Sequence, residues 1–61
     1  MRYFKDKYWI YELTDDLTKY HWIYNLEYKK HLKGSWWDDT RPDIWKKWIE
    51  LTEQELFIEL L

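Results

Sequence analysis

A strict alternation of side chains over residues 18–28 most constrains how this chain can fold. Every second position carries an aromatic ring or another core-facing candidate: Thr18, Tyr20, Trp22, Tyr24, Leu26 and Tyr28. The positions between them are polar, apart from Ile23. Since successive side chains of a strand point to opposite faces, this period of two predicts a strand with one buried face. A helix would scatter the same rings around its circumference.

Residues 3–13 predict the partner strand of an antiparallel hairpin. If residues 14–17 form a four-residue turn, the aromatic and apolar residues of the two strands face one another. The expected pairs are Trp9 with Trp22, Tyr11 with Tyr20, Leu13 with Thr18, Tyr3 with Tyr28, Glu12 with Lys19, Ile10 with His21 and Tyr8 with Ile23. A slip of one residue would lose both apolar sets.

The only glycine, Gly34, leaves two alternatives for the chain that follows the second strand. It either turns the chain into a short third strand at residues 35–38, which completes a three-stranded meander, or it simply ends the second strand. The first alternative places His31 opposite Trp36 and Lys30 opposite Trp37.

Helix signals occupy residues 41–61. Residues 40–43, Thr-Arg-Pro-Asp, combine a capping residue, a proline for the first turn and an acid near the positive end of the helix dipole. Apolar residues then recur at helical spacing: Ile44, Trp45, Trp48, Ile49 and Leu51. A second capping signal, Thr52 with Glu55, precedes another apolar run. The region is therefore either one helix or two helices that break near Thr52.

This order of elements predicts an α+β fold in a single small domain, residues 1–61. An N-terminal antiparallel β-hairpin, or a three-stranded meander, would pack against one or two C-terminal α-helices. A chain of 61 residues has a small core, and without Cys it has no disulfide to strengthen it. Its six Trp and six Tyr supply the missing apolar mass, because each large ring buries roughly 150–250 Å².

Groups for catalysis or metal binding are sparse. Ser35 is the only serine and lacks the context of a nucleophile elbow. His21 and His31 lack the spacing of a metal motif. Asp38 and Asp39 are adjacent, so they would point to opposite sides of an extended chain. We therefore expect a protein that is not an enzyme and has no cofactor and no metal site.

Two segments are the candidate binding surfaces. Trp36 and Trp37 are consecutive, so an extended chain cannot turn both rings into one core, and at least one should be exposed beside Asp38 and Asp39. The second surface is the outer face of the hairpin. There Tyr8 and Ile10, together with Ile23, form an apolar patch that is either an interface or the seat of a second helix.

The charges divide unevenly along the chain, whose net charge is -2. Residues 1–33 carry seven Lys or Arg and five Asp or Glu, a balance of +2, and residues 34–61 carry three and seven, a balance of −4. The acidic half and the surplus of rings predict a small protein-binding module whose partner protein has a basic surface. We expect an accessory protein of a phage or mobile element that inhibits a host or defence factor by steric occlusion, with Trp36 or Trp37 as the anchor.

Two other functions remain open. The rings of Tyr20, Trp22 and Tyr24, with lysines nearby, could be a platform for a nucleic acid or a nucleotide, although the net acidity weakens that alternative. The chain could also be a structural homo-oligomer, such as a homodimer joined at strand edges. No apolar run approaches the roughly 20 residues of a membrane span, and the N-terminus lacks signal-peptide features. We therefore expect a cytoplasmic protein without membrane contact.

Overall fold

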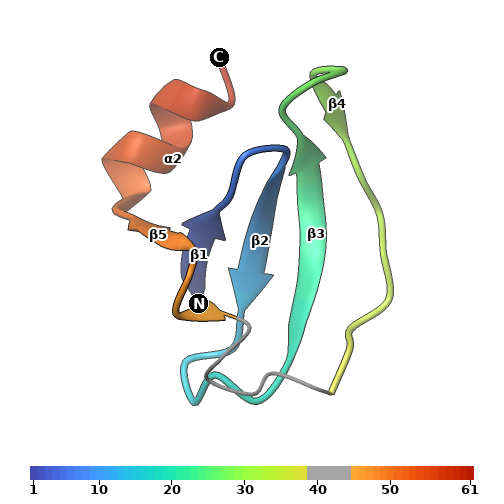
Figure 1. Ribbon diagram of the computed structural model, residues 1–61, viewed down its shortest axis with the longest axis vertical. Coiled ribbons are helices and arrows are strands. Elements are labelled where there is room, and N and C mark those ends of the chain that lie inside the picture. Colours follow the sequence, from blue (N-terminus) through green and yellow to red (C-terminus); the bar gives the residue numbers. More distant parts are fainter. Residues whose placement is uncertain (39–44) are drawn as a thin grey trace.

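The computed structural model describes residues 1–38 and 45–61. It confirms the α+β description and contains more strands than the sequence predicts. The antiparallel sheet has five strands in the order β4-β3-β2-β1-β5, and helix α2 follows β5 (Figure 1). The strands are β1 (Arg2–Lys5), β2 (Trp9–Leu13), β3 (Tyr20–Asn25), β4 (Lys30–His31) and β5 (Ile49–Leu51), and α2 spans Glu53–Glu59.

The single strand predicted at residues 3–13 is wrong in its middle, where the chain makes a tight turn between β1 and β2. Asp6 causes the turn. Its Oδ1 accepts hydrogen bonds from the backbone nitrogens of Tyr8 and Trp9, at 2.9 and 2.8 Å. Such a side-chain bond to the backbone two or three residues ahead favours a turn over a continued strand.

The predicted pairing of the first long hairpin is also wrong, by two residues. Leu13 pairs with Tyr20 and Tyr11 with Trp22. A turn does form at residues 14–17, where the nitrogen of Leu17 donates to the oxygen of Thr14 at 2.8 Å. The loop then continues to residue 19, because the carboxylate of Asp16 accepts hydrogen bonds from the nitrogen and hydroxyl of Thr18. A shift of two residues leaves each side chain of this half on its expected face.

A β-bulge at Ile23 changes the faces in the second half of β3. Tyr11 pairs with Trp22, but Ile10 pairs with Tyr24, so Ile23 is an extra residue with no partner in β2. Beyond the bulge, Tyr24 lies on the face opposite Trp22. Ile23, the one residue that interrupts the sequence alternation, therefore marks the place where the strand changes sides.

The short third strand proposed at residues 35–38 is wrong. The residues that pair with β3 as a strand are Lys30 and His31, opposite Asn25 and Tyr24. The expected pairs of His31 with Trp36 and of Lys30 with Trp37 are therefore wrong too. Farther along, Trp37 forms an isolated β-bridge with Tyr20.

The helical region predicted at residues 41–61 is only partly correct. Its first capping signal and Asp39 lie outside the described residues. Ile49–Leu51 is instead a strand that pairs antiparallel with β1. The pattern in these three residues, apolar-polar-apolar, is too short to distinguish a strand from a helix. The second capping signal is confirmed. Thr52 Oγ1 accepts from the nitrogen of Glu55 at 3.1 Å, and Glu55 Oε1 accepts from the nitrogen of Thr52 at 2.9 Å.

The sheet buries apolar residues on both of its faces. On the first, which we call the aromatic face, Phe4, Tyr11 and Leu13 form a core that Trp45 and Trp48 cover. On the second, which we call the helix face, a core of Ile10, Tyr24 and Leu51 packs against Leu56 of α2 and Leu60 at its C-cap. Two thin layers of side chains thus stabilise one sheet. No helix among the described residues has the length and apolar character to cross a membrane.

Candidate functional site

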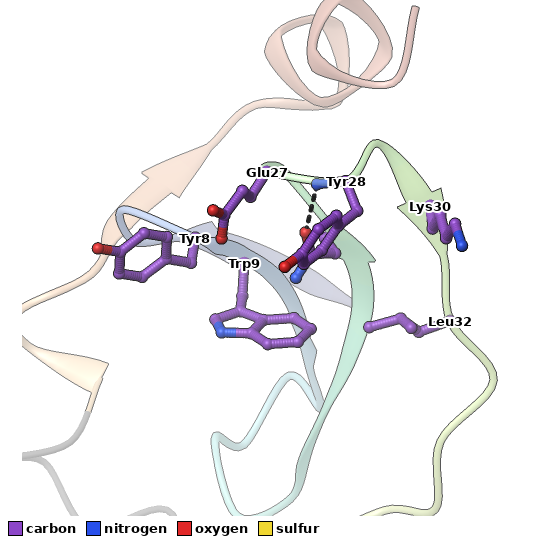
Figure 2. Close-up of a pocket in the computed structure, with 7 residues that line it drawn as sticks. Tyr8, Trp9, Glu27, Tyr28, Lys30 and Leu32 are labelled. Carbon is purple, nitrogen blue, oxygen red and sulfur yellow. Dashed lines mark hydrogen bonds between the residues drawn. The ribbon is translucent and has the colours of Figure 1, made fainter.

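The aromatic face is hollowed beside β4. One hollow of about 470 Å³ is lined by Tyr8, Trp9, Asn25, Glu27, Tyr28, Lys30 and Leu32 (Figure 2). A second, of about 410 Å³, is lined by Trp9, Trp22, Leu32, Lys33 and Gly34. The hollows share Trp9 and Leu32, so they adjoin on the surface. We call the two hollows together the Trp9 groove.

One wall of the groove is fixed by the turn between β1 and β2. The bonds from Tyr8 and Trp9 to Asp6 Oδ1 hold the backbone of both ring-bearing residues. Oδ2 of the same carboxylate accepts a hydrogen bond from the hydroxyl of Tyr11 at 2.6 Å. Burial, assisted by this bond, raises the pKa of Tyr11 well above its ordinary value. Asp6 therefore joins the groove wall to the buried core of the aromatic face.

The opposite wall depends on the buried amide of Asn25. Its Oδ1 accepts a hydrogen bond from the backbone nitrogen of Tyr28 at 2.7 Å, and this holds the turn that presents the Tyr28 ring (Figure 2). The nitrogen of Leu26 donates to the oxygen of Tyr8 at 2.8 Å, which connects the two turns. Both walls are therefore bonded to each other in the folded chain. A groove built in this way needs little ordering when it binds a partner.

Trp22 lies beside Trp9 and extends the groove toward the isolated bridge at Trp37. The rings of Trp9 and Trp22 meet edge to face, with centroids 6.2 Å apart. Trp22 and Trp37 meet in the same manner at 5.9 Å. Leu32 is held across from Trp22 by the hydrogen bond from its nitrogen to the oxygen of Ile23, at 3.0 Å. The groove thus has an apolar centre with an exposed indole, Trp37, beyond one end.

The charged residues of the groove are mainly basic. Lys30 and Lys33 line it, and Glu27 is the one acid among its lining residues. Within residues 1–38 and 45–61, no carboxylate oxygen lies within 4.0 Å of the ammonium nitrogen of Lys30 or Lys33. The ammonium of Lys7 lies 5.4 Å from the centre of the Tyr8 ring at the outer rim.

Comparison of the chain with protein-family models, curated proteins and solved structures finds no match. The chemistry of the site is therefore inferred from the residues themselves.

The two tryptophans predicted as an anchor point to opposite sides of the sheet. Trp36 is 40% exposed and lies against His21, with ring centroids 4.0 Å apart, whereas Trp37 is 54% exposed and lies against Trp22. Both are partly open to solvent, as expected for adjacent rings in an extended segment. Of the two, Trp37 is the one beside the Trp9 groove.

The remaining predicted site residues are scattered. Asp38 is exposed, and its Oδ1 lies 3.8 Å from the Nζ of Lys19, away from the groove, while Asp39 is outside the described residues. Tyr8 is exposed at the groove rim. Ile10 is 0% exposed, so the apolar patch that it was expected to form with Tyr8 does not exist at the surface. The helix face encloses it, which was the second alternative for that patch.

His21 and Glu12 form the clearest polar pair on the helix face. Nε2 of His21 lies 2.7 Å from Oε1 of Glu12, and Nδ1 of His21 is buried without a hydrogen-bond partner in the described structure. The part of the chain that is described holds no group of three or more His, Cys, Asp or Glu residues arranged for a metal ion.

Trp9, Tyr28 and Leu32 were not predicted as site residues, because the sequence pattern places Trp9 and Tyr28 in a closed hairpin core. Two signals point to them. Asp6 and Asn25 interrupt otherwise strand-like segments, and both residue types bond to backbone nitrogens two or three positions ahead. Asp6 therefore marks the turn that carries Tyr8, and Asn25 marks the turn that carries Tyr28.

Proposed function

We propose that this protein is a non-catalytic binding module that holds an extended segment of a partner protein in the Trp9 groove. One observation carries the proposal: the two open hollows share Trp9 and Leu32, so they lie next to each other, and aromatic rings line both. Two adjoining hollows suit successive side chains of one extended segment. Aromatic-lined grooves are a recurrent means of binding extended and proline-rich peptides.

The residue types of the groove support this function. Trp and Tyr are enriched at the energetic centres of protein interfaces because they offer large, rigid contact areas. Trp9 is braced by Trp22, while Tyr8 and Tyr28 stand at the rim with their rings exposed. The hydrogen bond between Leu26 and Tyr8 fixes the walls before binding, which lowers the entropic cost of association.

Selection from a library of displayed random peptides tests the proposal. Peptides that bind are then titrated with the isotope-labelled protein and followed by backbone and indole NMR shifts. We expect the largest shifts at Trp9, Tyr28 and Leu32. Shifts confined to α2 and β5 would contradict the proposal.

A pair of variants with similar exposure sharpens the test. Tyr28 is 69% exposed in the groove, and Phe57 is 66% exposed on α2, outside the groove. We expect Tyr28→Ala to weaken peptide binding at least about tenfold, as for an interface ring that contributes more than 1.4 kcal/mol. Phe57→Ala should leave the affinity unchanged. Equal effects of the two substitutions would place the binding surface elsewhere.

A homo-oligomer is the second candidate function, and one observation favours it. Apolar side chains of the edge strand β5, of α2 and of the residue after its cap are exposed: Ile49, Phe57, Ile58 and Leu61. Exposed apolar surface on a small chain is typical of an interface. Light scattering over a range of concentrations tests this function. A dimer that becomes a monomer in Phe57→Glu would support it, and a monomeric wild-type protein at millimolar concentration would contradict it.

The expected inhibition of a host or defence factor stays a prediction, because it depends on the identity of the partner.

A further inference from the structure

We infer that the segment bound in the Trp9 groove is an acidic peptide, with carboxylates beside an aromatic or aliphatic anchor. This inference rests on the proposed function and adds the chemistry of the partner. It follows from where the charges lie in the folded protein, and it differs from the basic partner that the acidic C-terminal half predicts.

Three of the four acids in residues 50–61 form ion pairs or hydrogen bonds within the protein. Glu50 forms a two-pronged pair with Arg2, at 2.8 and 2.7 Å. Glu59 pairs with Lys5 at 2.5 Å. Glu55 caps the start of α2 through Thr52. On the side of the molecule that carries β5 and α2, two acids are therefore paired with cations and a third is engaged by the helix cap.

The lysines of the groove lack such compensation. Lys30 and Lys33 have no carboxylate within ion-pair distance in the described parts of the chain, and each lines one of the two hollows. A peptide that places its apolar anchor on Trp9 brings its neighbouring side chains toward these two ammonium groups. Carboxylates at those positions gain complementary charge, whereas basic side chains meet repulsion.

The same groove suits a peptide better than a single-stranded nucleic acid. A single strand carries one phosphate charge per nucleotide and is bound through a row of cations that follows its backbone. The groove has two lysines, and the carboxylate of Glu27 lines it too. Its centre, formed by Trp9, Trp22 and Leu32, is apolar. This arrangement matches a ligand with an apolar anchor and a few acidic groups.

Three fluorescent peptides of equal length test the inference. Each keeps the anchor residues of the best displayed binder, and the flanking positions are all Glu, all Gln or all Lys. We expect the Glu peptide to bind at least about fivefold tighter than the Gln peptide, and the Lys peptide to bind most weakly. The advantage of the Glu peptide should shrink as the salt concentration rises, because these charges are exposed.

Charge-reversal variants locate the effect. Lys30→Glu with Lys33→Glu should reverse the preference between the Glu and Lys peptides. Lys29→Glu is the matched control, since Lys29 lies in the same turn as Tyr28 but lines a separate hollow with Tyr24 and Leu26 of the helix face. It should preserve the preference. The same reversal in the Lys29 variant would overturn the assignment to the groove.

The possible failures separate the inference from the proposed function. If the Gln or Lys peptide binds as tightly as the Glu peptide, the inference is wrong and the peptide-binding function stands. If a ten-residue oligothymidylate displaces the Glu peptide and binds more tightly, the acidic ligand is a nucleic acid and the inference is wrong. If no displayed peptide binds at millimolar concentration, the proposed function fails, and the inference fails with it.

Discussion

The indole of Trp48 lies parallel on the phenol ring of Tyr11, with centroids 3.7 Å apart and planes inclined by 6°. Trp48 immediately precedes β5, whereas Tyr11 lies in the middle of β2. Phe4 and Tyr20 pack around the same indole, with ring centroids at 6.5 and 5.8 Å. The contact therefore anchors the segment before β5 to the centre of the sheet.

Loss of this indole should destabilise the protein strongly. We expect Trp48→Ala to lower the free energy of unfolding by about 3 kcal/mol, toward the lower end for Trp-to-Ala changes in cores because Trp48 is only partly buried. Chemical denaturation followed by far-ultraviolet circular dichroism measures this change. Tyr28→Ala, at an exposed ring, is the control and should cost below about 0.5 kcal/mol. Similar losses in both variants would contradict the role of the stacked pair.

Tyr11 makes stability sensitive to alkaline pH. Burial, followed by the hydrogen bond to Asp6, raises the pKa of Tyr11 above its ordinary value of 10.0. The unfolded chain releases this proton near pH 10 and the folded chain releases it at higher pH, so this contribution to stability is lost as the pH rises above 10. We expect Tyr11→Phe to flatten that decline in denaturation curves, compared with Tyr28→Phe. An equal decline in both variants would exclude Tyr11 as a source.

The start of α2 depends on its reciprocal cap. We expect Thr52→Ala to reduce stability by about 1 kcal/mol, since it leaves the backbone nitrogen of Glu55 without its acceptor. Thr52→Ser keeps the hydroxyl and should restore most of the loss. Denaturation midpoints of the three proteins give the comparison. A serine variant as unstable as the alanine variant would show that the methyl group, and not the hydrogen bond, is what matters.

The two sides of α2 should respond differently to truncation. Leu60 packs against the core of Ile10, Tyr24 and Leu51, whereas Phe57 is 66% exposed. We expect Leu60→Ala to cost about 2 kcal/mol and Phe57→Ala below about 0.5 kcal/mol in the monomer. Thermal unfolding at low protein concentration measures both. A larger loss for Phe57→Ala would mean that the outer side of the helix is covered.

The sequence alone predicted the elements whose signals are local. The alternation around Tyr20 and Trp22 correctly indicated β3, and the pair Thr52 and Glu55 correctly indicated the start of α2. β5 was missed, because Ile49 and Leu51 suit either period and the choice depends on pairing with β1, far away in the sequence. Long-range pairing of this kind leaves no mark in a three-residue segment.

The candidate site was harder to predict than the strands. At least one of Trp36 and Trp37 was expected to be exposed, and both are, whereas Ile10, expected either in an exposed patch or beneath a helix, is fully buried. Whether such residues are buried depends on which face of the sheet the helix covers. The bulge at Ile23 moves Tyr24 to the helix face, where it joins the core around Ile10. The groove itself arises where two turns meet, through the bond between Leu26 and Tyr8. Contacts between turns cannot be read from the pattern of either turn alone.

The bulge at Ile23 has a consequence for how the chain tolerates change in length. Trp22 contributes to one layer, whereas Ile23 and Tyr24 contribute to the other. Deleting one residue here would place Tyr24 on the aromatic face, beside the indoles, and would remove it from the core beneath α2. Point substitutions in β3 should therefore be far easier to accommodate than deletions or insertions, and natural variants are expected to keep the spacing of this strand even where its residues differ.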